Sequence, residues 1–198
     1  MTRWIVIPIK ALADCKTRLA PALDDRARRE LVTRMFQQTF AAASETGDPV
    51  LLLGPSRHGM PTNIPLLGDP GQGLNAALAV AKKAAIAANV DRLVLLSADL
   101  PTIDSSDVRS LTQLEGAAVG IAPDLALVGT NALSLPLPQA ADWRFGFGPA
   151  SFAAHEQEAE RCGLHSVRIF RRGLALDVDR VEDLTLLANN QLSAQAPF

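Results

Sequence analysis

A mostly apolar run reads Arg92-Leu-Val-Leu-Leu-Ser97 and is followed closely by Asp99-Leu-Pro101. Continuous apolar runs of this length are typical of strands that are buried on both faces of a parallel sheet. Two similar runs lie upstream, at residues 4–9 and 49–53, and a weaker one covers residues 64–67. The sequence therefore predicts a buried sheet with the run at Arg92 near its centre.

Helical patterns separate these predicted strands. A helix with an aspartate cap is predicted over residues 24–46, an Ala-rich helix over 75–89, and a short helix over 105–114. Strands that alternate with helices predict a mostly parallel sheet with helices on both faces.

The second half of the chain contains consecutive strands with little helix between them, which indicates antiparallel additions at one edge of the sheet. Helices are predicted over residues 151–162 and 182–190. The predicted strands are residues 117–122, 131–135, 167–170 and 174–178. We expect one α/β domain over residues 1–190 and a loose C-terminal tail over residues 191–198.

Apolar residues make up 48% and charged residues 20% of the 198 positions, a balance that excludes an intrinsically disordered chain. The formal net charge of -2 provides no basic field for nucleic acid or an anionic membrane. The charge is unevenly distributed, because residues 1–34 contain eight basic and four acidic residues and the remainder contains 11 and 17. This distribution suits a site that takes in phosphates at one end and holds a cation at the other.

Nothing in the composition indicates export or a membrane anchor. The first apolar stretch is too short for a signal peptide, and polar side chains interrupt residues 74–90. Cys15 and Cys162 cannot form a zinc site alone. We expect a reduced, soluble, cytoplasmic protein with no nucleic-acid or membrane partner.

Ligands of open α/β sheets gather beyond the carboxyl ends of the strands. The loop after the first predicted strand presents Lys10, Lys16 and Arg18 there, and such cations can bind the oxygens of a triphosphate. The loop lacks the Walker pattern of glycines and lysine. A solvated basic loop is the alternative interpretation.

A glycine-rich loop, Gly71-Gln-Gly73-Leu-Asn75-Ala76, precedes the Ala-rich helix and matches a dinucleotide-binding pattern. In that pattern an acidic residue ends the following strand, whereas Asp91 begins one here. We therefore interpret the glycines as a loop that a nucleotide can approach closely, and not as evidence for a nicotinamide cofactor.

Three aspartates have positions that suit a metal ion. Asp99 follows the central strand, and Asp177 and Asp179 alternate along a predicted strand, so that both carboxylates point to one face. Hard oxygen donors in threes beside a cationic loop indicate magnesium, and the like charges repel one another when no metal is bound. The alternatives are that Asp99 caps a turn before Pro101 and that Asp179 caps the last helix.

Several short motifs occur in order between about residues 4 and 187. They are Pro8-Ile-Lys10, Lys16-Thr-Arg-Leu19, Gly73-Leu-Asn75, Ala98-Asp-Leu-Pro101, Gly129-Thr-Asn-Ala132, Phe147-Gly-Pro-Ala-Ser151 with His155, and Leu176-Asp-Val-Asp179 with Glu182-Asp-Leu184. Together they resemble the CofC/FbiD guanylyltransferases of coenzyme F-420 biosynthesis. The resemblance implies a single-domain, GT-A-like (Rossmann-like) nucleotidyltransferase fold, with GTP and magnesium. It also implies GMP transfer to phosphoenolpyruvate, 2-phospho-L-lactate or 3-phospho-D-glycerate, with release of pyrophosphate.

The resemblance also implies roles for individual residues. The magnesium ligands would be Asp99, Asp177 and Asp179, and the catalytic residues Lys16, Arg18 and Asp99. The nucleotide would be bound by Lys10, Lys16, Arg18, Gly73 and Asn75, and the acceptor by Thr130, Gly148 and Ser151. The chain departs from the family at residues 124–128, where a glycine-rich polar run is frequent, and at Ala150, where a second glycine is common.

The implied chemistry agrees with the residues available. A phosphate oxygen of the acceptor attacks the α-phosphorus of GTP, and that phosphate is largely ionised at neutral pH because its second pKa is about 6. No general base is then needed, and His58, His155 and His165 lack the spacing or motif of one. The reaction needs charge neutralisation and in-line positioning, which a metal and cations supply.

Two alternatives stay open at this point. One is a nucleotidyltransferase for another acceptor, such as a sugar phosphate or molybdopterin, and the other is a GTP-binding module without turnover. The expected partners are GTP and the phosphorylated acid. The family is also compatible with a homodimer and with hand-off of an unstable product to the next transferase of the pathway.

Overall fold

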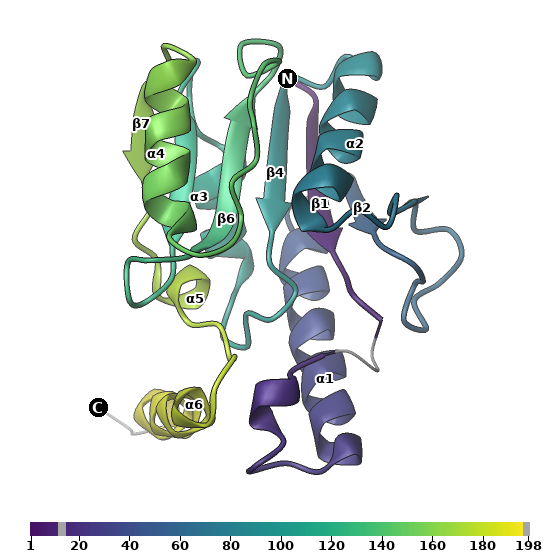
Figure 1. Ribbon diagram of the computed structural model, residues 1–198, viewed down its shortest axis with the longest axis vertical. Coiled ribbons are helices and arrows are strands. Elements are labelled where there is room, and N and C mark those ends of the chain that lie inside the picture. Colours follow the sequence, from purple (N-terminus) through teal and green to yellow (C-terminus); the bar gives the residue numbers. More distant parts are fainter. Residues whose placement is uncertain (12–14, 196–198) are drawn as a thin grey trace.

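The computed structural model describes residues 1–11 and 15–195, and within them the chain forms one mixed sheet with helices on both faces (Figure 1). The strands are β1 (Arg3–Pro8), β2 (Val50–Leu53), β3 (Leu66–Leu67), β4 (Arg92–Leu96), β5 (Val119–Pro123), β6 (Thr130–Pro136) and β7 (Ser166–Arg168). Their order is β3-β2-β1-β4-β6-β5-β7, so β4 lies in the middle. Every residue of β4 is buried, which confirms the predicted central strand.

Among the described strands, β6 alone runs against its neighbours. It pairs antiparallel with β4 and with β5, whereas β1 pairs in parallel with β2 and β4, and β7 in parallel with β5. The mostly parallel sheet is therefore confirmed, and the strands of the second half do add to one side of it through antiparallel pairs, although the antiparallel strand lies inside the sheet and not at its edge. All residues of β6 are buried, and a buried strand satisfies its backbone hydrogen bonds between two partners better than at an edge.

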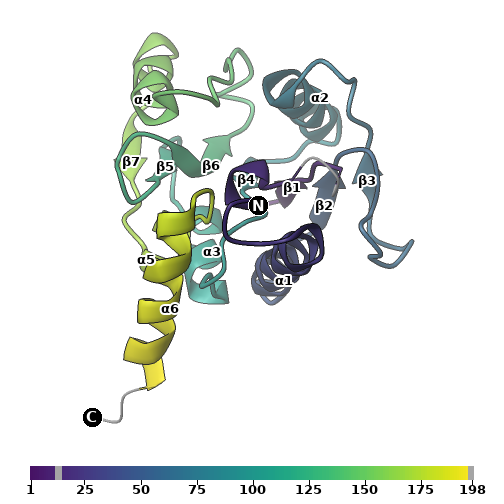
Figure 2. The ribbon, with the colours of Figure 1, turned by 60° about the horizontal axis from the view of Figure 1, so that its bottom comes forward.

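The helices divide between the two faces of the sheet. They are α1 (Asp25–Ser44), α2 (Leu74–Ala87), α3 (Ser105–Thr112), α4 (Ser151–Arg161), α5 (Arg172–Ala175) and α6 (Val181–Gln195), with a short 3-10 helix, η2 (Thr17–Leu19). Helices α2 and α4 cover one face, and α1 and α3 cover the other (Figure 2). Each face has its own apolar cluster, with Leu78 and Phe152 in one and Phe36 and Leu111 in the other. Burying a side chain of this size stabilises the fold by about 1.5–3 kcal/mol.

Side-chain caps fix where two helices begin. The carboxylate of Asp24 accepts a hydrogen bond of 2.8 Å from the backbone N–H of Ala27 at the start of α1. Asp104 and Asp107 form a reciprocal capping box at the start of α3. These contacts satisfy N–H groups that a helix leaves unpaired, and they agree with the helix starts that the sequence predicts.

The predicted strand over residues 174–178 is wrong. Its first residues belong to α5, a single helical turn, and residues 176–179 follow in an irregular segment. Leu174, Leu176 and Val178 are all buried, which explains the alternating pattern. The side chain of Asn131 donates to the carbonyl oxygens of Leu174 and Ala175, at 3.0 and 3.2 Å, and so stabilises a turn instead. A periodic pattern in the local sequence carries no information about a hydrogen-bond partner on a distant strand.

The last helix is longer than expected. Helix α6 extends to Gln195, so residues 191–195 of the predicted tail are helical. Residues 196–198 of that tail, and residues 12–14 of the basic loop, lie outside the described residues. No helix in the described part of the chain is long and apolar enough to cross a membrane.

Candidate active site

A cavity of about 380 Å³ opens at the carboxyl ends of β1 and β4, on the side of the molecule that faces forward in Figure 2. Its walls come from the end of β1, the basic loop, the glycine-rich loop before α2, and the segment after β4. Five of the predicted site residues line it: Lys10, Lys16, Gly73, Asp99 and Asp179. The cavity thus lies where ligands of α/β sheets bind.

Lys16 lies between two carboxylates in this cavity. Its ammonium nitrogen Nζ donates to Asp99 Oδ2 and to Asp179 Oδ1, each at 2.5 Å, and only 9% of its side chain is exposed. Its backbone has a φ of 54°, a left-handed conformation that costs a residue other than glycine about 1–2 kcal/mol. The two ion pairs therefore hold the lysine at a position that its backbone does not favour.

Lys16 and Asp179 stabilise each other in the charged form. Burial lowers the pKa of Lys16, but the neighbouring carboxylates more than offset this effect and keep the pKa above its ordinary value. Burial raises the pKa of Asp179, but Lys16, with smaller effects from Arg18 and Lys10, brings that pKa below its ordinary value. Both side chains are therefore ionised at neutral pH.

Asp177 completes the acidic cluster from a less favourable environment. Burial, and then the charges of Asp99 and Asp179, raise the pKa of Asp177 to about 6. Its Oδ1 accepts a hydrogen bond of 3.3 Å from Asn131 Nδ2. The ionised form of a buried carboxylate near other negative charges is stabilised when a cation binds beside it.

The three carboxylates fit a divalent cation. One oxygen each from Asp99, Asp177 and Asp179 can be chosen such that all three lie within 4.8 Å of one another. Such hard donors suit magnesium, which keeps several waters and bridges substrate phosphates. The carboxylates converge although the predicted reason for it, alternation along one strand, is wrong.

Helix capping does not account for the carboxylate of Asp179. At the start of α6, Asp183 Oδ2 accepts hydrogen bonds from the backbone N–H groups of Asp179 and Arg180, at 2.9 and 2.7 Å. The carboxylate of Asp179 contacts Lys16 instead. At this helix start the side chain that binds backbone N–H groups is thus Asp183 and not Asp179.

The other residues predicted to bind the nucleotide surround this centre in different ways. Lys10 and Arg18 are exposed; Lys10 lines the cavity, and Arg18 lies in η2 and acts on Asp179 through its charge. Gly73 has a φ of 87°, and a Cβ built there has no atom within 4 Å. The backbone at Gly73 is thus open to close approach from the cavity side.

The residues predicted to bind the acceptor lie around the first turn of α4. Thr130 and Ser151 are buried, and Gly148 lies three residues before the start of the helix. His155 Nε2 accepts a hydrogen bond of 3.2 Å from the backbone N–H of Gly146, so its Nδ1 carries the proton and donates to Thr130 Oγ1 at 3.0 Å. Burial lowers the pKa of His155 to about 4, which keeps the ring neutral.

Asn75 is placed differently from Gly73. The backbone N–H of Phe147 donates to Asn75 Oδ1 at 2.9 Å, and Asn75 Nδ2 donates to the carbonyl oxygen of Phe147 at 3.0 Å. Gly73 and Leu74 line the cavity, whereas Asn75 is not among the described residues that do. Its amide is engaged with the loop that leads to α4.

Two residues organise the site although sequence reasoning gave them no role. Asn131 supports both α5 and Asp177, and His155 joins Thr130 to Gly146. Both are buried polar side chains within motifs quoted above. Their signal in the sequence is a polar residue on an otherwise apolar strand or helix face, which a buried hydrogen-bond partner must explain.

The chain matches the family model "Guanylyl transferase CofC like" over residues 3–191. A phosphoenolpyruvate guanylyltransferase of Rubrobacter xylanophilus is 37% identical over 195 residues, which cover 94% of each chain. A second, of Sphaerobacter thermophilus, is 34% identical over 197 residues, covering 96% of this chain and 94% of that one. A 2-phospho-L-lactate guanylyltransferase of Methanothermobacter thermautotrophicus is 33% identical over 191 residues, covering 93% and 83%.

Solved structures share the fold at lower identity. A protein assigned as a nucleotide-diphospho-sugar transferase from Desulfovibrio desulfuricans superposes with a TM-score of 0.82 at 18% identity, covering 98% of this chain and 90% of that one. A cytidylyltransferase from Leptospira borgpetersenii gives a TM-score of 0.62 at 14% identity, covering 100% and 89%. The expected nucleotidyltransferase architecture is confirmed over nearly the whole chain.

Proposed function

The chain belongs to the CofC-like family of guanylyl transferases, and on this premise we propose that it transfers GMP from GTP to phosphoenolpyruvate, with release of pyrophosphate. Phosphoenolpyruvate is the acceptor named for the relatives at 37% and 34% identity, and 2-phospho-L-lactate is named for the one at 33%. Together with 3-phospho-D-glycerate, these are small phosphorylated three-carbon acids. The reaction would supply coenzyme F-420 biosynthesis.

The observation that carries the proposal is the ammonium of Lys16 beside three converging carboxylates at one end of a cavity. Joining a triphosphate to a phosphorylated acid brings two anions together, so the site must supply positive charge. Lys16 supplies it from a fixed position, and the exposed Lys10 and Arg18 add to it. Preorganised cations of this kind stabilise the charge of a transferring phosphoryl group.

Magnesium is part of the proposal. Asp99, Asp177 and Asp179 would hold it. Their carboxylate oxygens are hard donors, and both these donors and the raised pKa of Asp177 favour a cation at this point. When bound, magnesium neutralises phosphate charge and orients the phosphate oxygens. Lys16 already balances part of the negative charge of the cluster, so the carboxylates of Asp99 and Asp179 are held in place before any ligand enters.

On the acceptor side, the proposal needs orientation and no general base. The acceptor phosphate is largely ionised at neutral pH, since its second pKa is about 6. The buried His155 is hydrogen-bonded through both ring nitrogens and so does not serve as a base. Gly148 and Ser151 lie at the N-terminal end of α4, where the helix dipole favours an anionic acid. Thr130 begins β6 and is hydrogen-bonded to His155 of α4.

One incubation series tests the proposal. The purified chain is mixed with GTP, Mg²⁺ and each of the three acids, and pyrophosphate release and product mass are measured. We expect the guanylylated acid, fastest with phosphoenolpyruvate, and much slower release with ATP, CTP or UTP. Parallel arms contain sugar phosphates and molybdopterin. Turnover only in those arms, or GTP binding without pyrophosphate release in any arm, would overturn the proposal.

A further inference from the structure

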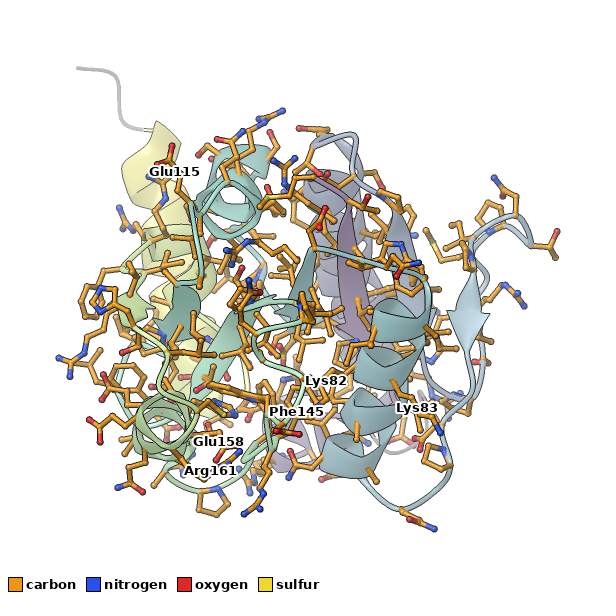
Figure 3. The ribbon with its side chains drawn as sticks, turned by 90° about the horizontal axis from the view of Figure 1, so that it is seen from above. Lys82, Lys83, Glu115, Phe145, Glu158 and Arg161 are labelled. Carbon is orange, nitrogen blue, oxygen red and sulfur yellow. The ribbon has the colours of Figure 1, made fainter. Side chains whose placement is uncertain are left out.

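The loop between β6 and α4 runs across one face of the molecule, between α2 and α4. We call its residues 141–148 the strap. Figure 3 shows Phe145 of the strap between Lys82 of α2 and the pair Glu158 and Arg161 of α4. Residues 143–147 have no regular secondary structure, so other elements must hold their backbone.

The first part of the strap is held by charged side chains from both helices. Lys82 Nζ donates to the carbonyl oxygens of Ala141 and Trp143, the latter at 2.7 Å. From α4, Arg161 donates to the carbonyl oxygen of Asp142 at 2.7 Å, and Glu158 accepts from the backbone N–H of Arg144 at 2.6 Å. This part of the strap lies toward the end of the sheet opposite the carboxyl ends of β1 and β4 (Figures 1 and 3).

The last part of the strap is held by two uncharged side chains. His155 Nε2 binds the backbone N–H of Gly146, and the amide of Asn75 binds both the N–H and the carbonyl oxygen of Phe147. The next residue is Gly148, and Ser151 begins α4 three residues later. Three backbone groups directly before the predicted acceptor residues are therefore fixed by side chains from two helices.

We propose that Asn75 is a positioning residue for the acceptor: from the first turn of α2, it holds Phe147 and thereby sets Gly148 and Ser151. This inference rests on the proposed function, because it assigns the Gly148–Ser151 region to acceptor binding. Asn75 follows Gly73 and Leu74, both of which line the cavity. The start of α2 therefore contacts both the predicted nucleotide site and the loop that leads to the acceptor residues.

The chemistry of the contact explains why asparagine occupies this position. A side-chain amide carries an acceptor oxygen and a donor nitrogen side by side, so it can bind the N–H and the C=O of the same residue at once. Without it, residues 146–148 would gain backbone freedom that acceptor binding must then remove. A loss of this kind weakens binding of the acid, whereas a nucleotide in the cavity keeps its contacts to Gly73 and Lys16.

The test measures both substrates separately in Asn75→Ala and Asn75→Asp. We expect KM for the acid to rise about tenfold, in line with the loss of two hydrogen bonds, while KM for GTP changes less than about twofold. Asn75→Asp keeps the acceptor atom for the Phe147 N–H but turns a carboxylate toward its carbonyl oxygen, so it should be impaired at least as much as Asn75→Ala. The aspartate also suits the N-terminal turn of α2, which favours folding of this variant.

Lys82→Met is the matched control, because Lys82 holds the strap from the same helix but at Ala141 and Trp143. Its KM for the acid should stay within about twofold of the parent, since both of its contacts are to the first part of the strap and not to the residues next to Gly148. A rise in KM for GTP with an unchanged KM for the acid in Asn75→Ala would overturn the inference and assign the amide to the nucleotide. No change in either KM would also overturn it.

Amide hydrogen exchange provides a readout that does not depend on turnover. The amides of Gly146 and Phe147 should exchange faster in Asn75→Ala than in the parent, with exchange in β4 and α1 unchanged. Equal exchange in the two proteins would overturn the inference even if activity changed. If the parent shows no GTP-dependent turnover, the proposed function fails, and the exchange comparison still decides whether Asn75 holds the strap.

Discussion

Lys16 Nζ lies 2.5 Å from Asp99 Oδ2, although 83 positions separate the two residues in the chain. The pair joins the basic loop after β1 to the segment after β4. Because Asp179 accepts from the same nitrogen, one ammonium ties together three distant parts of the chain. This arrangement makes Lys16 a counterion for the acidic cluster, and in the proposed function it is also a cation for the ligand.

Replacing Lys16 with alanine should lower turnover about tenfold to a thousandfold, as loss of a preorganised charge at a transferring phosphoryl group does. The chain should still fold, because the lysine lies in a loop and not in the apolar clusters. Pyrophosphate release and circular dichroism check the two parts. Lys83→Ala, which removes an exposed lysine from α2, is the control and should behave like the parent. A folded Lys16→Ala variant with full activity would show that Lys16 is not part of the catalytic site.

The substitutions Asp177→Asn and Asp179→Asn should both abolish magnesium-dependent turnover but should differ in stability. The pKa of Asp177 is raised to about 6, so its charge at neutral pH disfavours the folded state, and the neutral variant should melt a few degrees higher without metal. Asp179→Asn loses the ion pair with Lys16 and should not gain stability. Thermal melts in EDTA and in Mg²⁺ plus GTP measure this, and only the parent should gain from the ligands. Near-parental turnover in both variants would exclude the metal site.

The difference between Asp177 and Asp179 shows where sequence reasoning stopped. It predicted three carboxylates that repel one another, and the three do lie close together. It also predicted that Lys16 is a functional cation, but nothing in the local sequence indicates that Lys16 points at the carboxylates. That contact depends on the left-handed turn at Lys16 and on the path of the chain after α5, neither of which has a periodic signal.

The fold could be predicted from the sequence more completely than the site. Buried residues leave a hydrophobic pattern in the sequence, whereas polar contacts between distant residues leave none. The apolar runs of β1, β2 and β4 and the spacing of α2 located these elements to within a few residues. The position of β6 inside the sheet could not be derived, since consecutive strands are compatible with either an edge or the interior. The turn of α5 was missed because Asn131 stabilises it from a strand more than 40 positions away.

Ala150 provides a test of backbone strain at the start of α4. It adopts a φ of 56°, where alanine is disfavoured by about 1–2 kcal/mol and glycine is not. Relief of this strain is partly offset by the greater freedom of glycine in the unfolded chain, about 0.4–1 kcal/mol, so Ala150→Gly should stabilise the protein by about 0 to 1.6 kcal/mol. Urea denaturation measures the difference. Gly163→Ala, at a φ of 66°, is the reverse change and should destabilise by a similar amount. A lower stability for Ala150→Gly would contradict the interpretation of strain.

His155 should make the folded state sensitive to mild acid. Burial lowers its pKa from 6.5 to about 4, so the unfolded chain binds a proton between these values and the native protein does not. Stability from this group is therefore fully present above pH 6.5, declines as the pH falls toward 4, and is constant below that. The groups that face the ring are Glu158 on the same helix, Thr130, the Gly146 N–H, and the aromatic rings of Trp143 and Phe147.

The measurement compares the free energy of unfolding of the parent and of His155→Gln from pH 7 to pH 4. The parent should lose on the order of 3 kcal/mol relative to the variant over this range, since one pKa unit corresponds to about 1.4 kcal/mol. The opposing effect of Asp177 is common to both proteins and cancels in the difference. Parallel pH profiles would show that His155 binds protons equally in the folded and unfolded states.

The acidic cluster has a consequence for the order in which the protein matures during synthesis. Translation completes the central strands once residue 136 has left the ribosome, yet the nascent chain then carries only Asp99 of the three carboxylates. Asp177 and Asp179 emerge more than 40 residues later, and Asp179 reaches Lys16 only when α5 has docked beside Asn131. The scaffold of the site can thus form during synthesis before the acidic cluster is complete. A nascent chain arrested before residue 177 has only one of the three carboxylates and cannot assemble the proposed cation site.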